Sequence, residues 1–273
     1  MKFLFSFLLL YIISFAASAG KVDTVSIYSN SMHKYIKAVV IRPESYKIKK
    51  KNFPVVYLLH GYDGWYSNWI IRAAELKDHA DTYQTLIVCP DGATASWYFD
   101  SPVDTSYRYE THISSEVVGF IDKHYRTIAD KAHRAITGLS MGGHGALFIG
   151  LRHPDIFGAA GSMSGGFDLV ETKNKYEISK RIGDTVLHAK DWHDLSVINL
   201  IENYPPAGLR IIFDCGEKDI FINANRKLHQ KMQQLKIPHE YTERPGMHNW
   251  DYWRNSIVFQ LLFFQRFFNL PGH

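Results

Sequence analysis

A serine in the middle of a Gly-x-Ser-x-Gly pattern, Ser140 in Gly138–Gly142, is the candidate nucleophile of this chain. The spacing suits that chemistry because such a serine sits on a tight strand-to-helix turn, where small residues two positions away let neighbouring segments approach. The string alone arises by chance in about one chain in ten of this length. Residues 135–137 favour a strand and residues 144–150 a helix, which supports a nucleophile over the alternative, a glycine-rich turn. Neither glycine-rich phosphate-loop pattern occurs at this position.

A serine hydroxyl needs a histidine base and a carboxylate to act as a nucleophile near neutral pH. In chains with this motif, the acid and then the histidine follow the serine. Asp214 lies within a predicted strand, whereas Asp219 lies beyond its end, and His248 follows the next predicted strand. Catalytic groups gather at the carboxyl ends of parallel strands. The sequence therefore predicts Asp219 as the acid and His248 as the base, with Glu217 as the alternative acid.

The developing oxyanion of an acyl transfer needs two N–H donors. One is the backbone N–H of Met141, which directly follows the nucleophile. The other is expected from the loop after the predicted strand at 54–59, where Gly61 allows a sharp turn and Tyr62 supplies the N–H. The side chain of His60 is predicted to be a structural hydrogen-bonding group.

The elements that must position these residues alternate between strand and helix from residue 54 onward. Two β-branched runs at 22–29 and 35–42 predict an antiparallel pair before them. The later strands are predicted at 54–59, 86–89, 134–138, 158–163, 210–215 and 239–243, and the helices at 67–80, 113–125, 142–152, 220–235 and 250–268. This order predicts one α/β domain over 20–273, with a mostly parallel sheet covered by helices on both faces. Residues 165–206 are predicted to be an insertion over the active-site edge of the sheet.

The first 19 residues have the layout of a secretory signal peptide. Lys2 gives a positive start, residues 3–15 are apolar, and Ala17-Ser18-Ala19 resembles a cleavage site. The alternative is an uncleaved membrane anchor, but the apolar run of about 13 residues is shorter than the roughly 20 that span a bilayer. We therefore expect cleavage after Ala19, a secreted or periplasmic protein, and no stable membrane anchor.

Composition excludes several classes of protein. The chain has 46% hydrophobic residues and a formal net charge of +4, from 31 Lys and Arg against 27 Asp and Glu, which is a globular profile. The basic excess is expected to be spread along the chain, with Lys49–Lys51 as its only run, so nucleic-acid binding is not predicted. Two cysteines exclude a disulfide scaffold. No metal is predicted, since His188 and His193 lack a third ligand.

Together these residues resemble the esterase D-like branch of the α/β-hydrolase superfamily. That branch includes secreted carbohydrate and feruloyl esterases, tributyrin esterases, S-formylglutathione hydrolases and the antigen 85 acyltransferases. The resemblance covers nearly all of residues 20–273. It rests on the segments 57–61 (YLLHG), 90–92 (PDG), 96–98 (SWY), 138–146 (GLSMGGHGA), 214–216 (DCG) with Asp219, and 248–250 (HNW) with Tyr252 and Trp253.

The resemblance implies the α/β-hydrolase fold and no cofactor. It gives Ser140, Asp219 and His248 the roles of nucleophile, acid and base, and it makes the Tyr62 and Met141 amides the oxyanion hole. It also implies substrate contacts near the active site, for which the candidates are Trp97, Tyr98 and Trp250. In the strand order of this superfamily, Cys89 and Cys215 lie too far apart for a disulfide, so both are expected to be buried free thiols.

The expected reaction is hydrolysis of a carboxylic ester through an acyl-enzyme. The expected partner is a small-molecule or carbohydrate-linked ester with a short acyl, hydroxycinnamoyl or acetyl group. The substrate stays open because residues 165–206 carry no family signature. Two alternatives are an acyltransferase with the same triad, in which an alcohol replaces water, and a non-catalytic binding module. The complete set of Ser140, Asp219 and His248 argues against the second.

Overall fold

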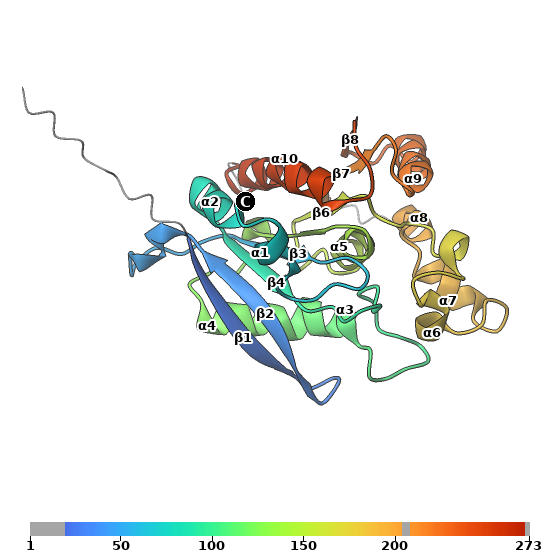
Figure 1. The fold of residues 1–273 in the computed structure, drawn as a ribbon, viewed down its shortest axis with the longest axis horizontal. Helices are drawn as coiled ribbons and strands as arrows, with labels where there is room; N and C mark the ends of the chain where they lie inside the picture. The colour runs from blue at the N-terminus through green and yellow to red at the C-terminus, as the bar shows by residue number, and fades with distance from the viewer. Residues whose placement is uncertain (1–19, 204–207, 271–273) are drawn as a thin grey trace, which may run out of the picture.

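An eight-stranded sheet runs through the computed structural model, which describes residues 20–203 and 208–270 (Figure 1). The strand order is β1-β2-β4-β3-β5-β6-β7-β8. The strands are β1 (Lys21–Ser29), β2 (Lys34–Arg42), β3 (Val55–Leu59), β4 (Leu86–Pro90), β5 (Arg134–Gly138), β6 (Ala159–Met163), β7 (Arg210–Gly216) and β8 (Glu240–Arg244). β2 is antiparallel to β1 and β4, and the remaining pairs are parallel, so the predicted mostly parallel sheet is confirmed. The predicted signal peptide lies outside the described residues.

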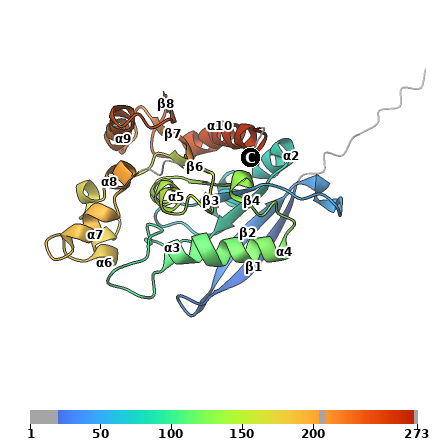
Figure 2. The same cartoon turned by 180° about the vertical axis from the view of Figure 1, so that it is seen from behind.

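Helices cover both faces of this sheet, as expected. The α-helices and the one π-helical element are α1 (Asn68–Arg72), α2 (Leu76–Tyr83), α3 (Tyr109–Thr111), the π-helical η2 (His112–Val117), α4 (Val118–His124), α5 (Met141–Arg152), α6 (Ile178–Ile182), α7 (Ala189–Asp194), α8 (Val197–Leu200), α9 (Ile222–Gln234) and α10 (Trp250–Phe268) within the described residues. Side chains of α1, α2 and α10 belong to one core cluster, and those of α4, α5 and α9 belong to the other. Figures 1 and 2 show these helices packed around the sheet. None of the helices within the described ranges has both the length and the apolar character of a membrane span.

The apolar runs that predicted the central strands are buried on both sides. In β3, Val55, Tyr57 and Leu59 pack into one cluster, and Val56 and Leu58 pack into the other. Successive side chains of a strand point to opposite faces, so a strand inside a two-sided sheet must be apolar at every position. This is why the strand prediction at 54–59 was accurate.

Two predicted helices differ from the observed ones. Residues 67–80 form two helices, α1 and α2, because Ala73 leaves the helical region at φ −134° and ψ 66°. The break lets Trp69 and Leu76 enter the same core cluster. The helix predicted at 113–125 starts earlier, at Tyr109, and passes through the π-helical η2 before α4. No glycine or proline lies at the break near Ala73 or in residues 109–117, so the sequence gave no sign of either difference.

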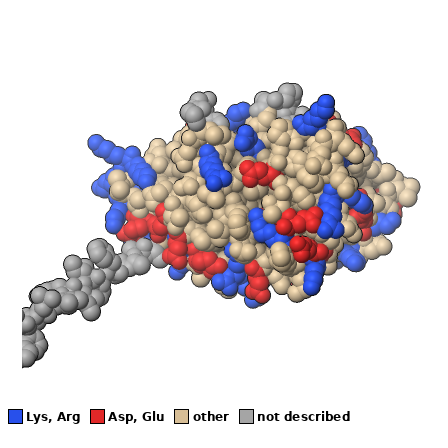
Figure 3. Space-filling model, turned by 90° about the horizontal axis from the view of Figure 1, so that it is seen from above, with Lys and Arg blue, Asp and Glu red and all other residues tan. Residues whose placement is uncertain are grey.

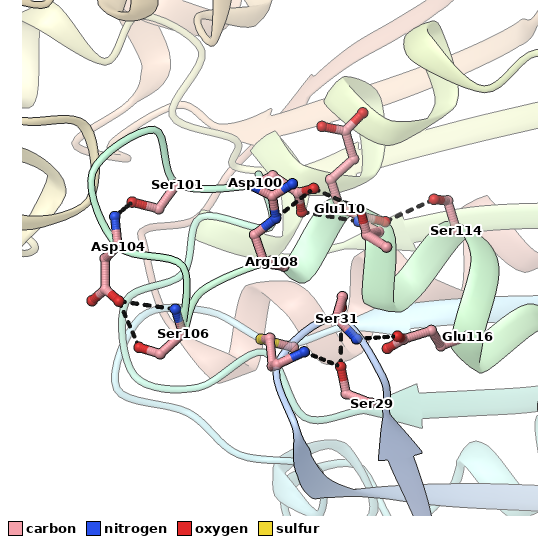
Figure 4. A network of polar contacts seen from close by, with 12 residues as sticks. Ser29, Ser31, Asp100, Ser101, Asp104, Ser106, Arg108, Glu110, Ser114 and Glu116 are labelled. Carbon is pink, nitrogen blue, oxygen red and sulfur yellow. Dashed lines mark hydrogen bonds and ion pairs between the residues drawn. The ribbon is translucent and has the colours of Figure 1, made fainter.

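The insertion at 165–206 contains α6, α7 and α8 with the one-turn helices η4 (Val170–Thr172) and η5 (Ile201–Asn203). It is tied to the loop at 100–108, which polar contacts hold in shape (Figure 4). In that loop, Asp104 accepts hydrogen bonds from the backbone N–H and the hydroxyl of Ser106. The same carboxylate pairs with Arg181 of α6 at 2.7 Å, and the Ser101 hydroxyl donates to the Arg181 carbonyl at 2.6 Å.

Both cysteines are buried free thiols in the described structure. Cys89 lies on β4 and Cys215 on β7, with β3, β5 and β6 between them. Neighbouring strands are about 4.8 Å apart, so the two residues are well beyond the roughly 7 Å between Cα atoms that a disulfide allows. Burial raises the pKa of both thiols. The predicted placement of the two cysteines on opposite sides of β5 is confirmed.

Candidate active site

Ser140 stands on the turn between β5 and α5 with φ 54° and ψ −116°. This conformation is strained for any residue with a side chain. Its backbone N–H donates to the carbonyl of Met163 at 2.9 Å, which holds the turn against β6. A Cβ on Gly142 would lie 2.5 Å from the carbonyl oxygen of His60, and one on Gly138 would lie 2.6 Å from Gly142. The two glycines of the motif are therefore required by close approach of backbone segments.

The structure brings Ser140, His248 and Asp219 together in one hydrogen-bonded chain. Nε2 of His248 lies 2.9 Å from Oγ of Ser140. Nδ1 of His248 lies 2.9 Å and 3.0 Å from the two carboxylate oxygens of Asp219. With the proton on Nδ1, the histidine donates to the carboxylate and leaves Nε2 free to accept the serine proton.

The position of Asp219 is fixed by a turn after β7. Its N–H donates to the carbonyl of Gly216 at 3.0 Å, and its Oδ1 accepts from the N–H of Phe221 at 2.8 Å. Asp219 is 4% exposed, whereas Glu217 points to solvent. The geometry places Asp219 beside the histidine and leaves the alternative acid, Glu217, outside the site.

His248 is held between two aromatic rings that the sequence reasoning did not assign to the site. The ring of Phe221 meets it edge-on at 5.2 Å and the ring of Trp253 at 4.9 Å between centroids. Trp253 is anchored in turn, because its Nε1–H donates to Oγ of Ser164 at 3.2 Å. Asn249 caps α10 by accepting from the N–H of Tyr252 at 3.1 Å. The family resemblance around His248 included Trp253 but gave it no role, and nothing in the sequence indicated that Phe221 lies at the site.

The two predicted oxyanion donors have free N–H groups. Across residues 20–203 and 208–270, neither the Tyr62 nor the Met141 backbone N–H has a hydrogen-bond acceptor in the protein. Met141 is the first residue of α5, where the N–H groups of a helix have no partner within it and favour negative charge. A Cβ on Gly61 would lie 3.4 Å from the Cβ of Ser140, so the loop that carries Tyr62 passes directly beside the serine.

A buried tyrosine and histidine support this loop from below. The Tyr98 hydroxyl accepts from the His60 N–H at 3.1 Å and donates to the His60 carbonyl at 3.2 Å. The His60 ring lies 2.8 Å from the Gly61 carbonyl through Nδ1, and its Nε2 accepts from the Gly92 N–H at 2.7 Å. Burial lowers the pKa of His60, which favours the neutral ring that this pattern requires. His60 thus has the structural hydrogen-bonding role predicted for it.

The structure places two of the three predicted substrate contacts differently. Trp97 and Tyr98 are 1% and 0% exposed, and neither lines the pocket above Ser140. Their polar atoms are used internally, since Nε1 of Trp97 donates to the Tyr176 carbonyl at 3.2 Å. A Cβ on Gly92 would lie 2.3 Å from the Tyr98 ring, so that ring fills the space beneath the oxyanion loop. We correct the expectation for both residues to a supporting role.

A pocket of about 360 Å³ opens above Ser140 and His248. Trp250 lines it, as expected. The other lining side chains include several that sequence reasoning missed: Asp63, Trp65, Asn68, Arg72, Tyr176 and Trp253. Tyr176 comes from the insertion at 165–206 and meets Tyr62 edge-on at 5.4 Å between ring centroids. The pocket is therefore walled mainly by aromatic rings, with one arginine and one aspartate.

A second buried carboxylate, Asp214, lies under α10 and away from the pocket. It accepts hydrogen bonds from Tyr252 at 2.8 Å, Ser256 at 2.5 Å and Gln260 at 2.9 Å. Burial raises its pKa despite these donors. Its position within β7 makes it structural, as the sequence suggested. Within the described ranges, no group of three or more His, Cys, Asp or Glu side chains is arranged to hold a metal ion.

Comparison with protein families gives a match over most of the chain. The family described as "Putative esterase" matches residues 29–264. The acetyl esterase of Caldicellulosiruptor saccharolyticus is 25% identical over 253 residues, which cover 86% of this chain and 94% of that protein. The endo-1,4-beta-xylanase/feruloyl esterase of Xylanibacter ruminicola is 35% identical over 158 residues, which cover 54% of this chain but only 22% of that longer protein.

Solved structures of esterases are also similar to this chain. A ferulic acid esterase superposes with a TM-score of 0.79 at 29% identity, covering 92% of this chain and 99% of that one. An S-formylglutathione hydrolase of Staphylococcus aureus has the same fold, with a TM-score of 0.79 at 17% identity over 91% of this chain and all of that one. The chain therefore belongs to the putative esterase family, has the α/β-hydrolase fold, and is a carboxylic ester hydrolase.

Proposed function

We propose that this esterase works through an acyl-enzyme on Ser140, with His248 as base and Asp219 as the acid that orients it. The observation that carries the proposal is the hydrogen-bonded chain from Oγ of Ser140 to Nε2 of His248 at 2.9 Å and from Nδ1 to Asp219 at 2.9 Å. A nucleophile, a base and an orienting carboxylate within hydrogen-bond reach are the arrangement that serine acylation needs.

In the first half of the reaction, Oγ of Ser140 attacks the ester carbonyl while Nε2 of His248 takes its proton. The carbonyl oxygen becomes an oxyanion, which the N–H groups of Tyr62 and Met141 stabilise. When the intermediate collapses, the bond to the alcohol oxygen breaks and that oxygen takes the proton from His248. The acyl group stays on Ser140 as an ester.

In the second half, His248 takes a proton from water and the resulting hydroxide attacks the acyl-enzyme. The second oxyanion uses the same two N–H groups. The bond to Oγ of Ser140 then breaks, the serine recovers its proton from His248, and the carboxylic acid leaves. Asp219 keeps its charge throughout and stabilises the imidazolium.

The substrates that this pocket suits best are short-acyl, acetyl or hydroxycinnamoyl esters of carbohydrates. Two features support the proposal. The pocket is walled by Tyr62, Trp65, Tyr176 and Trp250, whose rings can pack against a sugar face or a cinnamoyl ring. Among the relatives, the names acetyl esterase and feruloyl esterase describe such substrates. We also propose that residues 1–19 direct secretion and are removed after Ala19.

Labelling with a fluorophosphonate and a panel of esters test the proposal together. Wild type should take up one label per chain and hydrolyse p-nitrophenyl acetate, and Ser140→Ala should lose both. Because triad loss typically costs about 10⁴–10⁶ in kcat, a Ser140→Ala variant that keeps more than about a thousandth of the activity would show that another residue is the nucleophile.

The substrate is then assigned by comparing p-nitrophenyl esters of increasing chain length with acetylated and feruloylated sugars. Adding an alcohol acceptor separates hydrolysis from acyl transfer. A dominant transfer product would replace the hydrolase proposal by the acyltransferase alternative.

A further inference from the structure

A second pocket, of about 300 Å³, lies at the opposite edge of the sheet from Ser140. It is formed where β1 begins, where β2 ends, in the one-turn helix η1 (Glu44–Lys47), and in the segment between α4 and β5. The triad residues lie beyond the carboxyl ends of β5, β7 and β8, whereas this pocket lies at the amino-terminal ends of the parallel strands. Its lining residues are Lys21, Arg42, Pro43, Glu44, Tyr46, Lys47, Lys49 and Arg126.

This pocket carries a local excess of positive charge. Five of its lining residues are cations and one is a carboxylate, an excess of four. The whole chain has the same excess, with 31 basic against 27 acidic residues. The basic residues are spread along the sequence, and folding brings Lys21, Arg42 and Arg126 together from three separate segments. Figure 3 shows basic side chains at the end of the molecule from which the grey trace leaves, with acidic side chains beside them.

Both arginines of the pocket are held in place by Tyr46. The guanidinium carbon of Arg126 lies 3.9 Å from the centroid of the Tyr46 ring, and that of Arg42 lies 5.0 Å from it. Arg126 also donates to the carbonyl of Lys51 at 3.1 Å and to the carbonyl of Tyr46. Their orientation is thus set before any ligand arrives, which lowers the entropic cost of binding.

The charges in this pocket are only partly compensated within the protein. Arg42 pairs with Asp23 at 2.7 Å and Lys47 pairs with Glu44 at 2.6 Å. Over the described residues, Lys21, Lys49 and Arg126 have no carboxylate within 4.0 Å, and the buried Nε of Arg42 has no hydrogen-bond partner. Three cations without a carboxylate partner therefore line a cavity large enough for a small anion.

We propose that this pocket binds a phosphate group, either free or as the monoester of a small molecule. A phosphate carries about −1.5 to −2 charges at neutral pH and offers three acceptor oxygens, so one ligand can compensate most of the three unpaired cations. Guanidinium forks match phosphate oxygens, and lysines add charge without demanding one geometry. A monocarboxylate would leave two cations uncompensated. The site is separate from the esterase pocket, so its ligand does not compete with the ester.

Calorimetric titration of the purified protein with inorganic phosphate tests the proposal. Both lysines of the double variant Lys21→Gln/Lys49→Gln are exposed, so the fold should be kept while phosphate affinity falls at least about tenfold. The matched control Lys173→Gln/Lys236→Gln removes the same charge from exposed positions outside the pocket and should bind within about twofold of wild type. Hydrolysis of p-nitrophenyl acetate should be equal in all three proteins.

Chloride and acetate at the same ionic strength should give no saturable binding. Glucose 6-phosphate provides the second arm, because tighter binding than inorganic phosphate identifies a phosphomonoester as the ligand, and weaker binding identifies the free anion. Phosphate affinity that is equal in wild type and Lys21→Gln/Lys49→Gln would overturn the proposal. So would the absence of saturable binding of either phosphate. These outcomes are independent of the triad, since Ser140→Ala should bind phosphate as wild type does.

Discussion

Nε2 of His144, on α5, lies 2.9 Å from the carbonyl oxygen of Leu195 in the insertion. The other ring nitrogen faces the carbonyl of Trp97 at 3.3 Å. The ring is fully buried, and burial lowers its pKa to about 4, although both carbonyls favour the charged form. A neutral ring has one N–H, which the shorter distance assigns to Nε2. Three segments around the active site therefore meet on one neutral histidine.

Replacing His144 by phenylalanine should remove part of the acid sensitivity of the fold. The folded pKa of about 4 lies below the usual 6.5, so the unfolded chain binds more protons between these values. The stability from this group is complete above pH 6.5 and falls with pH toward 4, by at most about 3 kcal/mol. Urea unfolding at several pH values between 4 and 7.5 measures it. Parallel stability curves for wild type and His144→Phe would contradict the prediction.

Asp219→Asn should lower kcat by about 10³–10⁴-fold and leave measurable hydrolysis. The neutral amide cannot stabilise the imidazolium, and its N–H₂ can donate to Nδ1, which favours the tautomer with the proton on Nε2, while Ser140 and the backbone N–H donors remain. Glu217→Gln is the matched control, because it removes a carboxylate two residues away that points to solvent. Steady-state kinetics on p-nitrophenyl acetate compare the two. Equal losses in both variants would mean that net charge, and not the contact with His248, matters.

Ser140→Gly should be more stable than Ser140→Ala by about 1 kcal/mol. Both variants lack the hydroxyl, so their difference isolates the backbone at φ 54° and ψ −116°. Glycine adopts that region without the steric cost that alanine has, even after its larger loss of chain entropy. The free energy of unfolding in urea gives the difference. A more stable alanine variant would show that the turn is not strained.

Tyr98→Phe should lower kcat by roughly three- to tenfold with little change in KM. The hydroxyl holds both the N–H and the carbonyl of His60, and losing such bonds costs on the order of 1 kcal/mol. The loss would loosen the loop that carries the Tyr62 donor without changing the pocket wall. Tyr35→Phe is the control, since Tyr35 is 72% exposed. A change in KM alone would assign Tyr98 to substrate binding after all.

Thiol titration of the denatured, unreduced protein should give two free groups per chain. The sheet keeps Cys89 and Cys215 on strands that are not neighbours, and strand spacing forbids a bond between them. Mass spectrometry provides the check. A mass two hydrogens below that of the reduced form would require a different strand order.

The sequence predicted structure best at positions where one physical requirement restricts the type of residue. A strand buried on two faces must be apolar throughout, which located β3 and β4. The chemistry of acyl transfer needs a serine, an acid and a histidine in known order at the strand ends, which located Ser140, Asp219 and His248. The Gly-x-Ser-x-Gly string also predicted the turn between β5 and α5, because backbone segments approach too closely there for side chains at Gly138 and Gly142.

Features that depend on contacts between distant segments were not predictable. Tyr176 enters the pocket from an insertion that has no periodic pattern, and its position depends on how that insertion packs against α5. Trp97 and Tyr98 were expected at the substrate from the family resemblance, but an aromatic residue near a site can either contact substrate or pack beneath it. The packing of Tyr98 against Gly92 and His60 shows that its ring supports the loop and does not contact substrate. The basic pocket needs Lys21, Arg42 and Arg126 to meet, and their sequence separation hides this.

The three side chains that bind Asp214, namely Tyr252, Ser256 and Gln260, are spaced four residues apart on α10. One buried carboxylate thus accepts hydrogen bonds from side chains on the same face of the helix over two turns. Turning α10 by one residue would rotate that face by about 100° and separate all three donors from it. His248 lies two residues before the helix begins, so the contacts that hold the rotational register of α10 also help to hold the chain segment that carries the His248 side chain.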